Sequence, residues 1–318
     1  MKPDCSIIIR AFNEEKHIAR LLEGIFQQTI KDIEVILVDS GSLDGTVEIA
    51  KKFPVEIVHI KPIEFTFGRS LNMGINAAKS DLIVLASAHI YPVYPDWLER
   101  LLDPFSDNRV ALTYGKQRGI ETTHFSEKMI FSHWFPDISN WHQDHPFCNN
   151  ANAAIRRDLW AEHSYNENLP GLEDLAWARW AFDQGYQIAY VSEAEIVHVH
   201  NETWRGISNR YKREGMAFKT IYPQESFSKK DFFKALLSNV RNDFQAASKE
   251  KSLPKHWKQI IAFRWNQFLG TYQGYNQSGP LTWKLKQTFY YPRISAESKM
   301  IRRSIDPIQY QDQTEKVE

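Results

Sequence analysis

The segment that decides the fold is "CSIIIRAFNEEKHIARLLEGIFQQTIKDIEVILVDSGSLDGTVEIA", residues 5–50. It begins with a short β-branched run and continues into a stretch whose apolar residues recur at helical spacing. A second apolar run then leads into a glycine-containing turn and another helical stretch. This succession predicts right-handed βαβ units with parallel strands. We expect the first helix over residues 13–29, with acidic residues in its first turn.

The same alternation continues outward from this segment. Strands are predicted at 55–60 and 81–87, with a glycine-punctuated helix at 67–79 between them. Further strand and helix signals occupy 109–117, 152–163 and 173–191, and the chain after 205 reads as helical, charged and aromatic. The sequence therefore predicts an α/β, Rossmann-like fold with a mixed, mostly parallel sheet flanked by helices. We expect one domain over 1–204 and a helical C-terminal extension over 205–318, whose last twelve residues are polar and frayed.

Composition restricts the class of protein and its partners. The 318 residues contain 39 Lys and Arg and 39 Asp and Glu, so no net charge indicates a nucleic-acid partner. Two cysteines form no disulfide framework, and no signal-peptide-like or membrane-spanning apolar stretch is seen, which predicts a cytoplasmic protein. Basic and aromatic residues alternate in "KHWKQIIAFRWNQFLG", residues 255–270. We favour a helical cap there, with contact at the inner face of the membrane as a secondary role.

Polar residues follow three of the predicted strands. In open α/β sheets, ligands bind beyond the carboxyl ends of the strands. Asp39, just after "VILV", is suited to accept a hydrogen bond from a nucleobase N–H or a ribose hydroxyl. The alternative is that Asp39 and Asp44 only cap a turn and the next helix. The polar residues at the three strand ends are Arg10, Asn13 and Glu14, then Asp39, Ser40 and Asp44, then Ser87 and His89.

Five motifs in order carry a resemblance to a known family. They are "SIIIRAFNEE", "IEVILVDSGSLDGTVEIA", "GRSLNMGINAAKSDLIVLASAH", "NNANAAIRRDLW" and "GLEDLAWARWAFDQGYQIAYV", within residues 5–200. Together they resemble family 2 glycosyltransferases of the GT-A fold, most closely the bacterial rhamnosyltransferase-type members. The resemblance implies a nucleotide-diphosphate sugar donor and inverting transfer of a hexosyl or deoxyhexosyl group. The implied acceptor is a hydroxyl of a glycan or lipid-linked sugar in surface polysaccharide synthesis.

The resemblance also implies roles for donor-side residues. Asp39 matches the aspartate that contacts the base, and Asn13 and Glu14 match the first-strand loop beside the nucleotide. Arg69 lies, with Asn72, in the helix that borders the diphosphate. The expected donor site is Arg10, Asn13, Glu14, Asp39, Ser40, Asp44, Arg69, Ser87 and His89. For Gly68 and Gly74 we expect close packing of the helix against the sheet.

One motif departs from the family. Where its members carry Asp-x-Asp to hold Mg²⁺ or Mn²⁺, this chain has Ser87-Ala88-His89. Three interpretations stay open: manganese bound by neutral His89, stabilisation of the diphosphate by protonated His89 and Arg69 without metal, or an inactive site. His198 and His200 lie two residues apart, hence on one side of a strand, and either can converge with His89. We expect a divalent cation, if present, to be held by His89 and His200.

The remaining site residues concern the transfer itself. In "GLEDLAWA", the resemblance implies Asp174 as general base, with Glu173 beside it; the alternative is that both are first-turn acids favoured by the helix dipole. We expect Asp174 to face His89 across one crevice.

Asn150 and Asn152 are expected to contact the acceptor, and Trp141, with Trp134, to form its stacking wall. The alternative function is a non-catalytic nucleotide- or sugar-binding relative that has lost its metal motif. A nucleotidyltransferase would need a glycine-rich basic loop where this chain has "RAFNEEKH".

Overall fold

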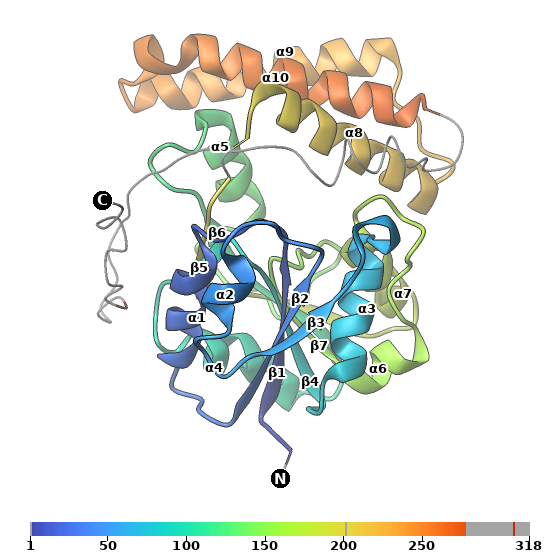
Figure 1. Ribbon diagram of the computed structural model, residues 1–318. Helices are drawn as coiled ribbons and strands as arrows, with labels where there is room; N and C mark the ends of the chain where they lie inside the picture. The colour runs from blue at the N-terminus through green and yellow to red at the C-terminus, as the bar shows by residue number, and fades with distance from the viewer. Residues whose placement is uncertain (1, 201, 278–307, 309–318) are drawn as a thin grey trace, which may run out of the picture.

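The computed structural model, which describes residues 2–200, 202–277 and 308, contains an eight-stranded sheet in the order β3-β2-β1-β4-β7-β6-β8-β5 (Figure 1). Four neighbouring pairs are parallel, namely β1–β2, β1–β4, β2–β3 and β6–β8, and three are antiparallel. The mixed, mostly parallel sheet predicted from the sequence is confirmed. The strands are β1 Cys5–Ala11, β2 Ile33–Asp39, β3 Glu56–His59, β4 Leu82–Ser87, β5 Ile90–Pro92, β6 Val110–Arg118, β7 Asn152–Arg156 and β8 Gln187–His198.

Helices cover both faces of the sheet and enclose two apolar cores. Ile7 and Ile9 of β1 belong to the core under α1, α2 and α4, whereas Ile8 belongs to the core under α3, α6 and α7. This separation follows from the alternation of side chains along a strand. The helices are α1 Ile18–Phe26, α2 Thr46–Ala50, α3 Phe67–Ala77, α4 Trp97–Leu102, α5 Phe125–Trp134, α6 Arg157–Glu162 and α7 Glu173–Asp183, with 3₁₀ turns η1 Pro62–Glu64 and η2 Asp103–Ser106.

Three long helices, which we call the crown, lie above the carboxyl ends of β1, β2 and β4: α8 Trp204–Ile221, α9 Lys229–Lys249 and α10 Leu253–Tyr275 (Figure 1). A Cβ atom on Gly270 or Gly274 of α10 would overlap backbone atoms of α8, so these two helices meet almost backbone to backbone. Arg264 forms a buried ion pair with Asp243 at 2.7 Å between α10 and α9. No helix in the described ranges is both long and apolar enough to span a membrane.

The predicted division of the chain at 204 and 205 stays a prediction. Part of the predicted extension, residues 278–307 and 309–318, lies outside the described residues, and with it most of the segment expected to be frayed. The amide of Ile308, the described residue of that segment, donates to the carbonyl of Val93, just after β5, at 3.3 Å.

The first helix begins later than the sequence predicts. α1 starts at Ile18, and its first turn contains no acidic residue. The preceding residues are instead fixed by the loop after β2: Asn13 donates its amide to Ser42 Oγ at 2.9 Å, and Glu14 donates its amide to Thr46 Oγ1 at 2.7 Å. Asn13 adopts a φ of 56°, in the left-handed region, which a helix would not allow. The loops after β1 and β2 are therefore joined side by side, and this pairing prevents the helix from starting at residue 13.

Candidate active site

Arg10 stands at the centre of the residues predicted to be catalytic. It lies near the carboxyl end of β1 beside Ser87 of β4, two residues before His89. Its Nη1 atom is 3.0 Å from Oε1 of Glu173, at the start of α7. The ion pair between Arg10 and Glu173 thus connects the end of β1 to the start of α7 at the carboxyl edge of the sheet.

Asp174 is partly buried, and backbone hydrogen bonds fix its orientation. The amide of Asn150 donates to its Oδ2 at 3.1 Å. Leu172, the residue just before α7 and two positions before Asp174, has a φ of 54°, a left-handed conformation that is rare for a branched side chain. Burial, and next the charge of Glu173, raise the pKa of Asp174 to about 7. A carboxylate with this pKa is a much stronger base than an exposed aspartate.

Three histidines converge near Arg10. The Nε2 atoms of His198 and His200 are 3.0 Å apart, and the ring of His89 stacks on that of His198 with 5.1 Å between centroids. One ligand atom from each of the three lies within 4.8 Å of the others. β8 ends at His198, so His200 lies just beyond the strand, but the two side chains still converge. His198 is almost fully buried and had been the less favoured of the two.

An oxygen atom orients each of the three rings from outside. Nδ1 of His89 is 2.7 Å from Glu14 Oε1, Nδ1 of His198 is 2.7 Å from Gln117 Oε1, and Nδ1 of His200 is 2.8 Å from Glu127 Oε1. The Nδ1 atoms of His198 and His200 each face an oxygen acceptor, and their Nε2 atoms face one another. Two unprotonated ring nitrogens that face each other at 3.0 Å repel unless a proton or a metal ion lies between them. Histidine ligands of metals are commonly held from behind by a carboxylate in this way.

The protonation of the rings differs. Burial lowers the pKa of His89, but the charge and hydrogen bond of Glu14 outweigh it, so that the net shift is upward. Burial, together with His200, lowers the pKa of His198 well below its usual value. His198 is therefore neutral near pH 7 and available as a ligand, whereas His89 exchanges a proton for any cation that binds.

Glu127 of α5 and Arg210 of α8 were not identified from the sequence. Oε1 of Glu127 lies 2.6 Å from Nη2 of Arg210 as well as next to His200, and Nη2 of Arg210 also reaches Glu202 at 2.7 Å. Burial raises the pKa of Glu127, but the charges of Arg210 and His200 outweigh this effect and lower it to about 2. Both residues lie within helices that carry no motif. In the sequence, the nearest indication of charge beside the histidines is Glu202, which follows "HVHN". Through Glu127, the crown is connected to the histidines.

The residues predicted to bind the nucleotide form hydrogen bonds with backbone groups of their own loops. Asp39 is 2% exposed and accepts from the amides of Gly41 and Ser42, both at 3.1 Å, so the bonds of the turn-capping alternative exist. Ser40 is buried and donates its hydroxyl to a backbone carbonyl. Asp44 accepts from the amides of Glu15 and Thr46 and thereby joins the two loops. These three residues therefore hold the loops beyond β1 and β2 in shape, independently of any ligand.

On the diphosphate side, Arg69 and its helix pack closely against a neighbouring loop. Arg69 pairs with Glu167 at 3.4 Å, and it is almost half exposed. Asn72 is buried and uses its amide group in hydrogen bonds within the protein. A Cβ atom on Gly68 would lie 2.6 Å from the carbonyl oxygen of Asn166, and one on Gly74 would overlap Ile8. The predicted packing of the helix against the sheet is confirmed for Gly74, whereas Gly68 packs against the loop at Asn166.

The predicted acceptor residues are not gathered together. Asn152 is fully buried; Trp97 donates to its Oδ1 at 2.9 Å, and its Nδ2 donates to the carbonyl of Ala194 at 2.8 Å. It has no exposed atom for a sugar, because it joins strands in the core, and we do not propose it as an acceptor contact. Asn150 is also buried and touches Asp174 through its amide. Trp141 lines a separate cavity of about 490 Å³ between α4 and the middle of β8, together with Asp96, Arg100, Asp103, Ser139, Val191 and Glu193.

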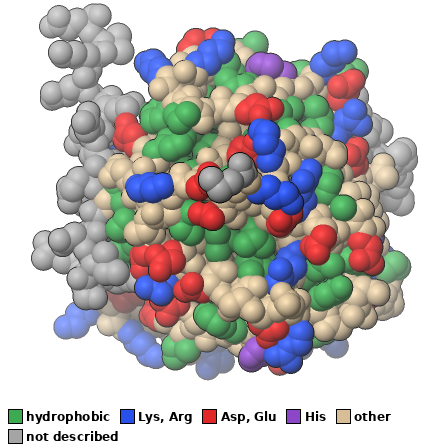
Figure 2. All heavy atoms as spheres, turned by 90° about the horizontal axis from the view of Figure 1, so that it is seen from below, with side chains coloured by type: hydrophobic (Ala, Val, Ile, Leu, Met, Phe, Trp, Pro, Cys, Tyr) green, Lys and Arg blue, Asp and Glu red, His purple; other side chains and the backbone are tan. Residues whose placement is uncertain are grey.

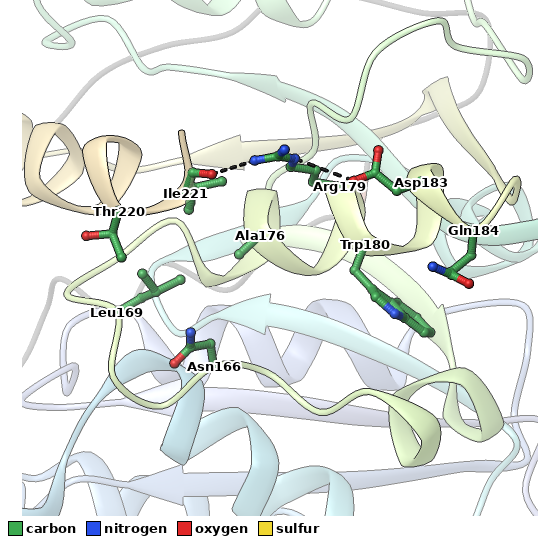
Figure 3. A pocket seen from close by; sticks show the side chains of 9 residues that line it. All are labelled: Asn166, Leu169, Ala176, Arg179, Trp180, Asp183, Gln184, Thr220 and Ile221. Atoms are coloured by element: carbon green, nitrogen blue, oxygen red, sulfur yellow. Dashed lines mark hydrogen bonds and ion pairs between the residues drawn. The ribbon is translucent and has the colours of Figure 1, made fainter. Parts of the chain in front are cut away.

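Another cavity, of about 310 Å³, lies along α7. Figure 3 shows Ala176, Arg179 and Trp180 of α7 beside it, with Thr220 and Ile221 from the end of α8 on its far side. Arg179 donates to the carbonyl of Ile221 and pairs with Asp183. The helix that begins with Glu173 and Asp174 is thus fixed to the crown further along its length.

Comparisons with known proteins agree with this architecture. A model of the family described as glycosyl transferase family 2 matches residues 6–163. The O-antigen chain rhamnosyltransferase WbaN of Salmonella anatum is 32% identical over 203 residues, which are 60% of this chain and 64% of WbaN, slightly under two thirds of its length. The O-antigen chain rhamnosyltransferase RfbN of Salmonella typhimurium is 29% identical over 224 residues, 66% of this chain and 71% of RfbN.

Among solved structures, a mannosyltransferase from Pyrobaculum calidifontis, determined with GDP-Man and Mn²⁺, superposes with a TM-score of 0.60. It covers 86% of this chain and 87% of its own, at 17% sequence identity, and it establishes the GT-A fold. The family model, the relatives and the ordered motifs lead to one conclusion: the chain belongs to glycosyl transferase family 2 and is similar to its bacterial rhamnosyltransferases.

Proposed function

We propose that this chain is an inverting glycosyltransferase, which moves a hexosyl or deoxyhexosyl group from a nucleotide-diphosphate sugar to a hydroxyl of a glycan or lipid-linked acceptor. The names of WbaN and RfbN support a role in surface polysaccharide synthesis and favour a deoxyhexose such as rhamnose. The free, buried cysteines Cys5 and Cys148 support the reducing cytoplasm as its location.

The observation that carries the proposal is the partly buried carboxylate of Asp174, whose pKa is raised to about 7 and which follows Glu173, the ion-pair partner of Arg10, at the start of α7. In an inverting transfer, one carboxylate removes the proton of the acceptor hydroxyl while that oxygen attacks the anomeric carbon from the side opposite the leaving group. Glu173 raises the basicity of Asp174 through its charge and holds Arg10 beside it. Desolvation supplies the greater part of that increase.

The donor would lie over the joined loops beyond β1 and β2. Asp39 is proposed to contact the base, and Asn13 to support the same loop. Arg10, whose guanidinium lies 4.9 Å from the centre of the Phe67 ring, would present positive charge to the diphosphate. Arg213 of the crown lies over the same ring at 4.6 Å and adds a second cation nearby. Positive charge placed before the reaction stabilises the negative charge that develops on the leaving diphosphate.

The three histidines fit a divalent cation. At a metal–nitrogen distance of about 2.1 Å and a right angle between ligands, two nitrogens are about 3 Å apart, which matches the separation of His198 and His200. Imidazole nitrogens suit manganese or zinc better than magnesium, which prefers oxygen. His89, His198 and His200 would hold the ion, and the ion would supply further stabilisation of charge on the diphosphate. Glu14, Gln117 and Glu127 contact the Nδ1 atoms and would leave the Nε2 atoms available as ligands.

A two-stage experiment tests this proposal. Nucleotide sugars with different bases and sugars are first screened by thermal shift, since a ligand of the native state raises its apparent stability. Turnover of the selected donor is then compared in the parent and in Asp174→Asn, with Asp183→Asn at the exposed end of the same helix as the matched control. We expect the first variant to lose about 10²–10⁴-fold in kcat with nucleotide affinity retained, and the control to lose nothing. Tight nucleotide binding without turnover in the parent, with EDTA or with manganese, would instead support the non-catalytic binding module.

A further inference from the structure

The outer side of the α9–α10 hairpin exposes large apolar side chains. Phe233 and Leu237 of α9 are 54% and 68% exposed, and Trp257, Ile261 and Trp265 of α10 are 42–45% exposed. Within each helix these residues are four apart, a spacing that keeps side chains on one side of the helix. Two helices that pack only for stability would place such residues inward. The hairpin does have an inward side, made by Phe232, Ile260 and Phe263, which are buried.

Phe232 links one exposed residue of each helix. The ring of Phe232 meets that of Phe233 edge-on at 5.0 Å and that of Trp265 edge-on at 5.4 Å. The exposed residues of the two helices therefore adjoin across Phe232. The stripe runs along both helices, from Trp257 near the start of α10 to Phe233 near the start of α9. We call these five residues the apolar stripe.

Basic residues surround the apolar stripe. From Lys229 to Tyr275 the hairpin contains nine Lys and Arg against three Asp and Glu, although the whole chain has equal numbers of each. Lys230, Lys234 and Arg241 stand three or four residues from stripe residues of α9, and all three are exposed. Lys258 lies over the Trp257 ring at 5.3 Å. Figure 2 shows the opposite face of the molecule, where acidic and basic side chains are intermixed. Positive charge is thus concentrated around the stripe.

We propose that the apolar stripe and its basic border dock the crown onto an anionic lipid bilayer. Tryptophan, leucine and phenylalanine side chains enter the boundary between headgroups and acyl chains, while lysine and arginine remain at the phosphates. The charge argues against a second copy of this chain as the occupant, because a symmetric contact would bring two strongly basic surfaces together. Docking in this way needs no bound donor and no turnover, and it would bring the enzyme to the surface where lipid-linked acceptors reside.

Vesicle partitioning of the full chain tests the proposal. The probes are phosphatidylcholine vesicles with and without about one third phosphatidylglycerol, measured by co-sedimentation at low and high salt. We expect the parent to bind only the anionic vesicles and to be released by salt, because each cation near the surface contributes about fivefold to binding. Leu237→Ser with Ile261→Ser should weaken partitioning by about tenfold or more. Lys230→Glu with Lys234→Glu should weaken it on anionic vesicles to a similar extent.

Matched pairs elsewhere on the surface serve as controls. Ile63→Ser with Ile138→Ser removes two apolar side chains that are 66% and 80% exposed outside the crown. Lys51→Glu with Lys52→Glu reverses two exposed charges after α2. Both control pairs should partition like the parent. Equal partitioning of parent, stripe variant and control, or no binding of the parent to anionic vesicles, would overturn the proposal. So would a stripe variant that changes only the oligomeric state in sedimentation, since the stripe would then bind another copy.

Discussion

The pKa of Asp174 leads to a quantitative prediction for the pH dependence of the transfer. Its folded-state pKa of about 7 means that the protonated form persists well above the usual range for aspartate. Only the ionised form can accept the acceptor's proton. About one tenth of the carboxylate is ionised at pH 6 and about nine tenths at pH 8, so kcat/KM should rise about tenfold between these two pH values and then level off.

Substitution of its neighbour sharpens the prediction. Glu173 raises the pKa of Asp174 by its negative charge and engages Arg10 at 3.0 Å. In Glu173→Gln that charge is lost, while an oxygen remains to accept from Arg10. The rise of kcat/KM should therefore move to lower pH, and the gain from pH 6 to pH 8 should shrink below tenfold. Desolvation remains, so the midpoint should stay above that of an ordinary aspartate.

The assay is initial-rate release of the nucleoside diphosphate at several pH values, with the donor chosen by thermal shift. Asp183→Asn, at the other end of α7 and 60% exposed in its side chain, provides the control and should keep the parent's profile. The assignment would be refuted if the parent's kcat/KM did not change between pH 6 and 8, or if Glu173→Gln gave the same pH profile as the parent. In either case the rise of kcat/KM could not be attributed to Asp174. The thermal stability of each variant at both pH values shows whether a change in rate reflects unfolding.

Three further outcomes are expected. His198→Ala should weaken Mn²⁺ binding at least about tenfold in titration calorimetry with the metal alone, because one of three nitrogens is lost; unchanged affinity would exclude the histidine site. Asp243→Asn should lower the free energy of unfolding by about 3–5 kcal/mol in denaturant titration, because Arg264 would stay buried without its partner. Gly68→Ala should destabilise the protein by about 1–3 kcal/mol, since the added Cβ would lie 2.6 Å from the Asn166 carbonyl oxygen; an unchanged midpoint would contradict the close packing.

The sequence predicted the parts of the fold that depend on local patterns. Alternating apolar runs and helical spacings identified the sheet type, and the ordered motifs identified the family, because both signals are contained in short segments. The start of α1 was missed because it depends on hydrogen bonds from Asn13 and Glu14 to a loop about thirty residues later.

The site shows the same limit. Arg10, Glu173 and Asp174 were predicted from motifs, and the structure brings them together. Glu127 and Arg210 act on the histidines from helices without a motif, so only the folded chain reveals them. Asn152 appeared in a motif of the expected acceptor region, but its hydrogen bonds lie in the core. The spacing of residues in the sequence predicts which face of a strand or helix a residue occupies. It does not predict whether another element packs on that face.

The backbone at Leu172 sets a limit on improving this enzyme by engineering. A leucine at a φ of 54° costs about 1 kcal/mol relative to an ordinary conformation, and glycine would adopt the same shape without that cost. Such a replacement would also let the first turn of α7 move, and with it Asp174, the proposed base. At this position, a substitution that raises thermal stability would lower turnover. Stabilising substitutions should therefore be sought in the crown or on the surface, away from residue 172.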